Sequence, residues 1–320
     1  MRLHYKIGLT MLALPLTWLS AIATAADDDG AVEELPAGIA AKVGEISISH
    51  DDVLSRVYGS EKSKSDPAEQ HVRSAYQYLM QAALLRCEAK ALGIVVSDDD
   101  RKWATQKLID ESKREIAEST GNALPWGQYL REIGHTEESF YKVMYDESEV
   151  VVLAHLVLNY FKLTTESVTY SDVRLVRYED ALKIKEKLDA GEDFDRLALL
   201  NSVDRRQGVR VAFRHQGLPK QVEEMLFDTL EPKKYSGIIT AGEGDYRIVM
   251  LKSRFKGESK TYQELKETIE KTFHEGGIRT PETFEQWVAV MYNTGKYAVR
   301  FRFPGETTKS TSTPARKDVK

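Results

Sequence analysis

Apolar residues recur at helical spacing through the first half of the chain. Between residues 67 and 92 they fall three or four positions apart, which predicts one long helix with a single buried stripe: Val72, Tyr76, Leu79, Met80, Ala83, Leu84, Cys87 and Ala91. Gly93 follows where a left-handed C-cap would end that helix. Ser97 and Thr136 stand at N-cap positions and predict two further helices, the second reaching about Phe161. A short helix is expected at 126–133.

The beginning and the end of this helical stretch carry strand patterns. Residues 39–48 predict two short strands around Gly44 and Glu45, followed by a short helix that Ser49 caps. Near the C-terminus, helices are expected at 261–274 and 281–293. The alternation over 297–303 then predicts a half-buried closing strand.

Residues 167–254 have a different character. Strands are expected at 170–176, 209–213, 236–240 and 246–251, with a turn at Gly242 and Gly244. Helices are expected between them at 179–190, 194–201 and 221–229. A small sheet flanked by helices, inserted into a helical region, makes the predicted fold class α+β.

The predicted division of the chain has six parts. They are a signal peptide at 1–25, a flexible leader at 26–36, a helical region at 37–166, the inserted domain at 167–254, a segment at 255–303 that completes the helical region, and a disordered tail at 304–320.

The first 25 residues predict export. Arg2 and Lys6 precede an apolar run, and Ala23-Thr24-Ala25 is a signal-peptidase pattern. The alternative is a membrane anchor, but the run is short for a spanning helix and ends in small residues. We therefore expect a periplasmic or other extracytoplasmic location, with no stable membrane insertion after cleavage.

Composition excludes several classes of function. The formal net charge is −5, and removing Arg2 and Lys6 gives −7, which argues against nucleic-acid partners. One cysteine, Cys87, cannot form an internal disulfide, and its place on an apolar stripe predicts a buried small side chain. The histidines lack ligand spacing, so neither a metal nor another cofactor is expected.

Three stretches of the helical region resemble the N-terminal chaperone region of the SurA/PrsA-like exported foldases. They are residues 43–53, 83–98 and 129–140. Residues 167–254 resemble a parvulin-type peptidyl-prolyl isomerase domain, through Ala181, Ala190–Phe194, Leu197-Ala198, Ala212-Phe213, Phe227, Ser236-Gly237 and Asp245–Val249. The resemblance covers nearly all of residues 38–303.

The resemblance implies rotation about X–Pro peptide bonds, which needs an apolar slot for the proline ring and a polar wall for the twisted amide. The implied slot residues are Phe213, Leu218 and Val222, with His215 beside them. Val222 stands where the family has phenylalanine. The family's central Asp/Cys position corresponds to about Asp204.

The family's two facing histidines are absent. Their positions correspond to Asp172 and Arg247, for which we hypothesise an ion pair in place of the histidine pair. Keeping the scaffold while losing both histidines predicts a weak or inactive isomerase domain.

The sequence leaves three functions open. The first is an exported folding factor that binds unfolded or newly translocated polypeptides. The second is an active peptidyl-prolyl cis-trans isomerase of the same architecture. The third is a non-enzymatic assembly or scaffold subunit with one fixed partner.

Overall fold

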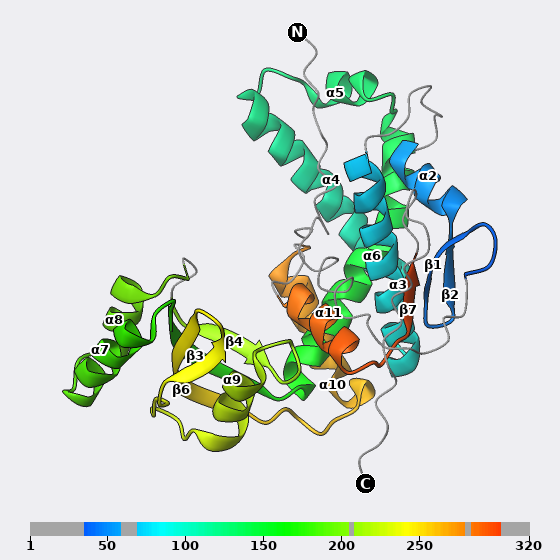
Figure 1. Ribbon diagram of the computed structural model, residues 1–320. Coiled ribbons are helices and arrows are strands. Elements are labelled where there is room, and N and C mark those ends of the chain that lie inside the picture. The colour runs from blue at the N-terminus through cyan, green and yellow to red at the C-terminus, as the bar shows by residue number, and fades with distance from the viewer. Residues whose placement is uncertain (1–34, 59–68, 205–207, 279–282, 302–320) are drawn as a thin grey trace. The chain divides into compact units, whose positions relative to one another are not determined.

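The computed structural model describes residues 35–58, 69–204, 208–278 and 283–301 (Figure 1). The chain forms two compact units. Unit 1 contains residues up to 160, 260–285 and those from 295 onward, whereas unit 2 contains 161–259 and 286–294. The predicted α+β class is confirmed: a mostly helical unit is built from the two ends of the chain, and the inserted unit carries a small antiparallel sheet.

Unit 1 begins with a hairpin packed on helices. Strand β1 (Ile39–Val43) pairs with β2 (Ile46–Ser49), and α2 (His50–Tyr58) follows at once. The Ser49 hydroxyl accepts a hydrogen bond from the Asp52 amide at 3.0 Å, so the predicted N-cap is confirmed. The long helix α3 (Glu69–Leu92) ends at Gly93, whose φ of 68° confirms the predicted left-handed cap.

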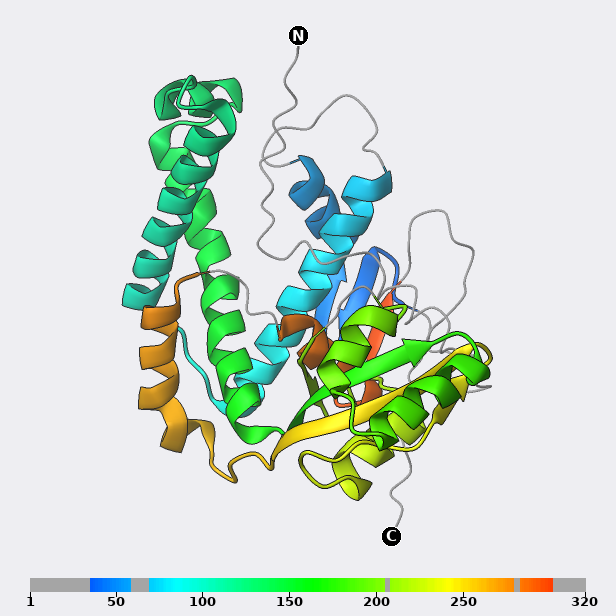
Figure 2. The ribbon, with the colours of Figure 1, turned by 90° about the vertical axis from the view of Figure 1, so that its left-hand side faces the viewer.

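Two long helices make the rest of unit 1's framework. Helix α4 (Asp98–Thr120) and α6 (Glu137–Thr164) run alongside each other, with the short α5 (Trp126–Glu132) between their ends (Figure 2). The Arg101 guanidinium donates to the Tyr145 carbonyl at 2.9 Å and joins the two helices. Helix α10 (Tyr262–Gly276) packs on them through Phe273, whose ring centroid lies 4.8 Å from that of Trp103.

The C-terminal strand closes the first sheet. Strand β7 (Val299–Phe301) pairs antiparallel with β1, giving the order β2-β1-β7. Just before it, Lys296 and Tyr297 both reach the buried carboxylate of Glu88 on α3, at 2.7 Å to Lys296 Nζ and 2.7 Å to the Tyr297 hydroxyl. Burial and the Glu88 hydrogen bond raise the pKa of Tyr297, so its hydroxyl stays a donor. This contact fastens the returning chain to the first long helix.

Unit 2 is built on a four-stranded antiparallel sheet in the order β4-β3-β6-β5. The strands are β3 (Ser167–Leu175), β4 (Arg210–Phe213), β5 (Ile239–Gly242) and β6 (Asp245–Phe255). Strands β3 and β6 are longer than the alternation predicts, and β6 extends past the buried positions to the exposed residues Ser253 and Phe255.

Helices cover both faces of that sheet. Helices α7 (Tyr178–Asp189) and α8 (Phe194–Asn201) lie on the face of Val173 and Ile248 (Figure 1). The other face carries α9 (Lys220–Glu224), which continues as the π-helix η2 (Met225–Thr229). Sequence analysis expects one helix at 221–229, and the change to wider turns at Met225 leaves both Leu226 and Phe227 buried against the sheet.

The outer edge of β4 is closed by side chains of unit 2. The Val211 carbonyl accepts a hydrogen bond from Gln286 Nε2 at 2.7 Å, and the Phe213 amide donates to Gln216 Oε1 at 2.9 Å. Gln286 belongs to α11 (Phe284–Asn293), most of which lies in unit 2. Capping these groups blunts the edge against pairing with another strand.

The two ends of the insertion lie next to each other. The Glu258 amide donates to the Leu163 carbonyl at 2.8 Å. Gly257 has a φ of 79°, and a Cβ on it would lie 2.3 Å from the Thr164 carbonyl oxygen. The backbones of Gly257 and Thr164 come so close that residue 257 must be glycine, which has no Cβ.

Several sequence predictions fall outside the described residues. These are the signal peptide at 1–25, the leader as far as residue 34, and the tail at 304–320. Cys87 is half-buried, and its Sγ lies 3.5 Å from the Val43 carbonyl oxygen. Among the described residues, no helix has the length and apolar character needed to cross a membrane.

Replacing Glu88 by alanine is expected to lower the free energy of unfolding of unit 1 by about 2 kcal/mol, since Lys296 and Tyr297 lose a charged hydrogen-bond acceptor. Urea denaturation with hydrogen exchange over β1 and β7 measures the loss. Lys90→Ala is the matched control, because the neighbouring Lys90–Glu45 pair is exposed and contributes under about 0.5 kcal/mol. Equal losses for the two substitutions would contradict a stabilising role for the Glu88 contacts with Lys296 and Tyr297.

Gly257→Ala is expected to destabilise unit 2 by about 3 kcal/mol, because the new Cβ meets backbone atoms and the positive φ becomes strained. The measurement is the unfolding transition of unit 2. Gly237→Ala serves as the control, since nothing lies within 4 Å of its added Cβ. A Gly257→Ala protein as stable as the control variant would refute the close approach.

Candidate functional site

Asp172 lies in the middle of β3 with almost no exposure. Its side chain is 2% exposed, and neither carboxylate oxygen has a hydrogen-bond partner. Alternation along the strand puts Asp172 on the same face as Tyr170 and Arg174, opposite Val173. A carboxylate therefore stands on the sheet face that also carries the apolar cluster under α9 and η2.

Two arginines flank that carboxylate. Arg247 Nη1, on β6, lies 3.9 Å from Asp172 Oδ2, and Arg210 Nη2, on β4, lies 3.4 Å from Asp172 Oδ1. Both distances are ion-pair distances without hydrogen-bond geometry. The hypothesised proximity of Asp172 and Arg247 is thus present, with Arg210 as an additional partner from the edge strand.

Each arginine has a stronger partner of its own. Arg247 forms a bidentate pair with Asp245, at 2.9 Å and 2.8 Å, and Arg210 Nη2 lies 2.9 Å from Asp204 Oδ2. Arg174 also donates to Asp245 at 3.0 Å. We call these residues the ion cluster: Asp172, Arg174, Asp204, Arg210, Asp245 and Arg247. Its three positive and three negative charges balance.

Burial and pairing act in opposite directions within the ion cluster. Burial raises the pKa of Asp172 above its ordinary value, and the nearby Arg210 and Arg247 offset only part of that effect. The Arg247 hydrogen bonds lower the pKa of Asp245. The fold therefore stabilises Asp245 as an anion, whereas it disfavours the ionised form of Asp172.

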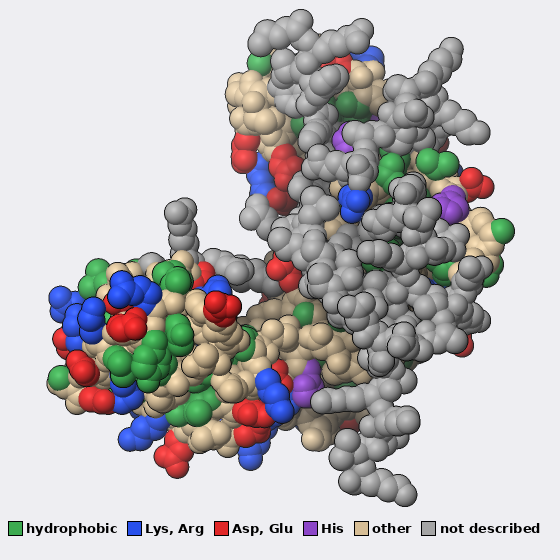
Figure 3. Space-filling view, in the orientation of Figure 1, with side chains coloured by type: hydrophobic (Ala, Val, Ile, Leu, Met, Phe, Trp, Pro, Cys, Tyr) green, Lys and Arg blue, Asp and Glu red, His purple; other side chains and the backbone are tan. Residues whose placement is uncertain are grey.

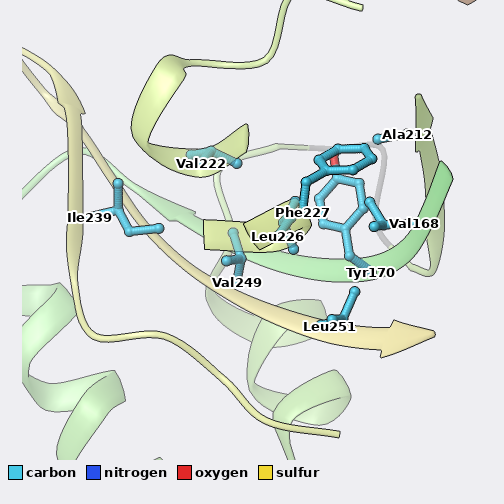
Figure 4. Packing of buried hydrophobic residues seen from close by; sticks show 9 residues of the cluster. All are labelled: Val168, Tyr170, Ala212, Val222, Leu226, Phe227, Ile239, Val249 and Leu251. Carbon is cyan, nitrogen blue, oxygen red and sulfur yellow. The ribbon is translucent and has the colours of Figure 1, made fainter. Parts of the chain in front are cut away.

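An apolar cluster adjoins the ion cluster on the same face. Figure 4 shows side chains from β3, β4, β5, β6 and the α9–η2 segment packed together: Val168, Tyr170, Ala212, Val222, Leu226, Phe227, Ile239, Val249 and Leu251. Val222 is 1% exposed, and Leu218 packs against this cluster while remaining partly buried. Val222 is therefore part of a closed core.

The structure does not bring all the predicted slot residues together. Phe213 alternates with Ala212, so it points to the other face of the sheet, where its ring centroid lies 4.6 Å from that of Phe161. His215 has a φ of 68° in the turn after β4, and its Nδ1 lies 3.3 Å from Glu223 Oε1. Leu218 and Val222 share the face of the ion cluster, whereas Phe213 does not.

Asp204 lies near Asp172, and Arg210 forms an ion pair with each of them. Sequence analysis overlooked Arg210, Asp245 and Arg174, although a signal exists in the alternation. Arg210 is two residues before the buried Ala212, and Asp245 is two before Arg247. Charged residues at core-facing positions of neighbouring strands are expected to meet.

The ion cluster offers few groups for chemistry on a bound chain. The guanidinium donors are directed at carboxylates of the cluster. Arg210 and Arg174 keep 24% and 41% of their side chains exposed, so they form its solvent side. Over the described ranges, no set of three or more His, Cys, Asp or Glu residues is placed to hold a metal ion.

Comparisons with solved structures find several foldases similar to this chain. The foldase PrsA from Streptococcus pneumoniae is 22% identical to this chain, with a TM-score of 0.29. The alignment covers 81% of this chain and 91% of the PrsA chain. The peptidylprolyl isomerase PrsA from Bacillus anthracis is 20% identical, with coverage of 68% and 96% and a TM-score of 0.32. A SurA-like chaperone structure from Campylobacter jejuni is 14% identical, with coverage of 83% and 99% and a TM-score of 0.28.

No protein-family model and no curated protein matches the chain.

Asp172→Asn is expected to leave the free energy of unfolding within about 1 kcal/mol of the parent at pH 7, because Arg210 and Arg247 each keep another carboxylate. The raised pKa means that ionised Asp172 weakens the fold. The parent therefore loses stability as pH rises from about 4, the ordinary Asp value, through the raised pKa of Asp172. The variant lacks this component.

Urea denaturation at stepped pH values measures both effects. Asp195→Asn is the control, because that carboxylate on α8 is 53% exposed and its ion pair with Lys252 lies outside the ion cluster. A loss of more than about 3 kcal/mol at pH 7 for Asp172→Asn would show instead that the Asp172 charge holds the two arginines in place.

Proposed function

We propose that this protein is an exported folding factor that binds unfolded or newly translocated polypeptides, and that its inserted unit is an inactive relative of the parvulin isomerases. The ion cluster is the observation that carries the second part. Support for the first part comes from the foldase-like sequence stretches, the signal-peptide pattern and the insertion of one unit into another.

Isomerisation requires a surface that is free to hold a proline ring and to favour a twisted amide. Here the positions that correspond to the two histidines are Asp172 and Arg247, and both are engaged in the ion cluster. Arg210 occupies the same face and is held between Asp172 and Asp204. Releasing a guanidinium to a substrate carbonyl would leave a buried carboxylate less well paired.

The apolar part of the expected slot is equally unsuitable. Val222 is buried in the cluster under α9, and Phe213 points to the opposite face of the sheet. Of the three predicted slot residues, Leu218 alone is partly accessible to a proline ring on this face. The geometry favours binding by other surfaces over catalysis at this one.

We expect the full chain to leave the cis-to-trans rate of a proline-containing test peptide at the uncatalysed value, because the ion cluster fills the catalytic positions. A protease-coupled peptide assay measures the rate, with a cyclophilin or parvulin as positive control. A rate more than about tenfold above the uncatalysed one would identify an active isomerase and refute the inactive assignment.

Near-stoichiometric amounts should suppress the aggregation of several unrelated unfolded proteins, as measured by light scattering. Serum albumin at the same concentration is the control for non-specific protection. Suppression restricted to one protein, together with capture of that protein alone, would favour the scaffold subunit over the general folding factor.

A further inference from the structure

Unit 2 has an exposed apolar patch where β3 leads into α7. Figure 3 shows hydrophobic side chains on the part of unit 2 that carries α7 and α8. Val176 is 57% exposed, Tyr178 45% and Leu182 40%, and the half-buried Tyr246 of β6 adjoins them. We call these four residues the α7 patch. Single exposed apolar residues are ordinary on a soluble protein, but a group of them in contact requires an explanation.

Local geometry joins the four side chains of the α7 patch into one surface. The ring centroids of Tyr178 and Tyr246 lie 5.6 Å apart, with an interplanar angle of 64°. Arg177 has extended backbone angles, which direct the side chains of its neighbours Val176 and Tyr178 to the same side. Leu182 follows Tyr178 by four residues on α7, so these two side chains are neighbours on the helix surface. The patch is therefore continuous from the end of β3 to the second turn of α7.

The turn between β5 and β6 borders the α7 patch at its β3 end. A Cβ placed on Gly244 would lie 3.7 Å from Val176 Cγ1. Gly244 is two residues before Tyr246, so Val176 and Tyr178 both lie against this hairpin. The patch and this turn are within the described residues throughout.

The core packing of α7 does not use Leu182. The helix buries Ala181, Ile184 and Leu188 against the sheet. At 100° per residue, Leu182 lies about 100° around the helix from Ala181 and about 160° from Ile184. The α7 patch therefore extends the apolar surface of the helix beyond the width that the core covers.

The unpaired charges beside the α7 patch are negative. Glu186 follows Leu182 by four residues on α7, and Glu243 stands next to Gly244 in the turn that borders Val176. Both residues are exposed, and neither forms an ion pair among the residues that the structure describes. A carboxylate without a cation therefore stands near each end of the patch.

The cations of the same segment are neutralised or point elsewhere. Arg177, Lys183 and Lys185 each form an ion pair with a nearby Asp or Glu. Lys187 has no ion pair among the described residues, but it lies about 140° or more around α7 from the patch residues of that helix. An occupant of the patch thus meets apolar side chains with free carboxylates at either end.

This charge pattern distinguishes between two occupants. A two-fold pairing of the patch with a second copy would set Glu186 and Glu243 opposite glutamates of that copy, and like charges disfavour such a contact. A segment with Lys or Arg on either side of aliphatic or aromatic residues complements both the apolar surface and the carboxylates. The second occupant therefore fits the patch, whereas the first does not.

We infer that the α7 patch binds segments of unfolded polypeptides in which aliphatic or aromatic residues are flanked by Lys or Arg. The inference rests on the proposed folding-factor function and names the class of segment that unit 2 selects. It requires none of the charged groups of the ion cluster.

The test uses the full chain and a labelled peptide of about ten residues, with Leu, Val and Phe in the middle and a Lys near each end. Fluorescence anisotropy measures binding. The double substitution Tyr178→Ser and Leu182→Gln should weaken binding about tenfold or more, because the apolar contact is lost. Leu54→Gln is the matched control, since Leu54 on α2 is 43% exposed, and it should leave the affinity within about twofold. Circular dichroism verifies that each variant is folded.

A second pair of variants tests the charges. Glu186→Gln combined with Glu243→Gln should weaken the Lys peptide about fivefold at low salt, and should leave the same peptide with Gln in place of Lys unchanged. Glu231→Gln is the control, because Glu231 is also exposed but lies outside the patch and its borders.

Three results would overturn the inference. The first is an equal affinity of the parent and the Tyr178→Ser, Leu182→Gln variant for the Lys peptide. The second is an equal affinity of the parent for the Lys and Gln peptides, which would refute the basic occupant. The third is a concentration-dependent dimer in sedimentation that this double variant loses, because a second copy would then be the occupant.

Failure of the inference is distinguishable from failure of the proposed function. If the parent suppresses aggregation and the double variant does so equally well with unchanged peptide affinity, the α7 patch is refuted and the folding factor stands. If the parent fails to suppress aggregation but loses peptide binding on substitution of the patch, the patch stands and the general folding function is refuted.

Discussion

The pairing of β7 with β1 is the constraint on which the architecture depends. The first described strand has neighbours on both sides, β2 from the following residues and β7 from the end of the described chain. The chain leaves unit 1 after residue 160 and must return to it before β7 can pair with β1. The Lys296 and Tyr297 contacts with Glu88 fix that return, and the adjacent segments at Leu163 and Glu258 show the same requirement at the root of the insertion. A long-range closure of this kind costs loop entropy that only the completed sheet and its helices offset.

The second determinant is the ion cluster on the sheet of unit 2. Buried charges rarely improve stability over a well-packed apolar core, so their arrangement needs a reason in geometry. Here the carboxylates of Asp204 and Asp245 neutralise the two arginines that face Asp172, and the cluster joins β4, β3 and β6. The same charge balance that makes it tolerable in the sheet directs the guanidinium groups of Arg210 and Arg247 to carboxylates of the cluster.

Much of the fold follows from local sequence signals, because caps and periodicity depend on near neighbours. Ser49, Gly93 and the two long helices of unit 1 were predictable in this way. The direction of Phe213 was not, since its packing on Phe161 depends on strand register rather than on the apolar character of the residue. The ion cluster was predictable only in part, because Asp172 with Arg247 follows from aligned positions, whereas Arg210 enters through the pairing of an edge strand. The Gln286 and Asn293 side chains of α11 donate to the Val211 and His215 carbonyls, and no periodicity reveals these contacts.

The two faces of the unit 2 sheet thus have different roles. The face of Asp172 is internally satisfied: its charges balance, and the side chains beside them are closed under α9 and η2. The other face is covered by α7 and α8, and branched side chains at the end of α8 and at Val211 stay exposed. Exposure of that kind is unfavourable for an isolated soluble domain and becomes favourable when an apolar chain covers it. An apolar chain that covers such side chains gains binding energy without using the charged groups of the ion cluster.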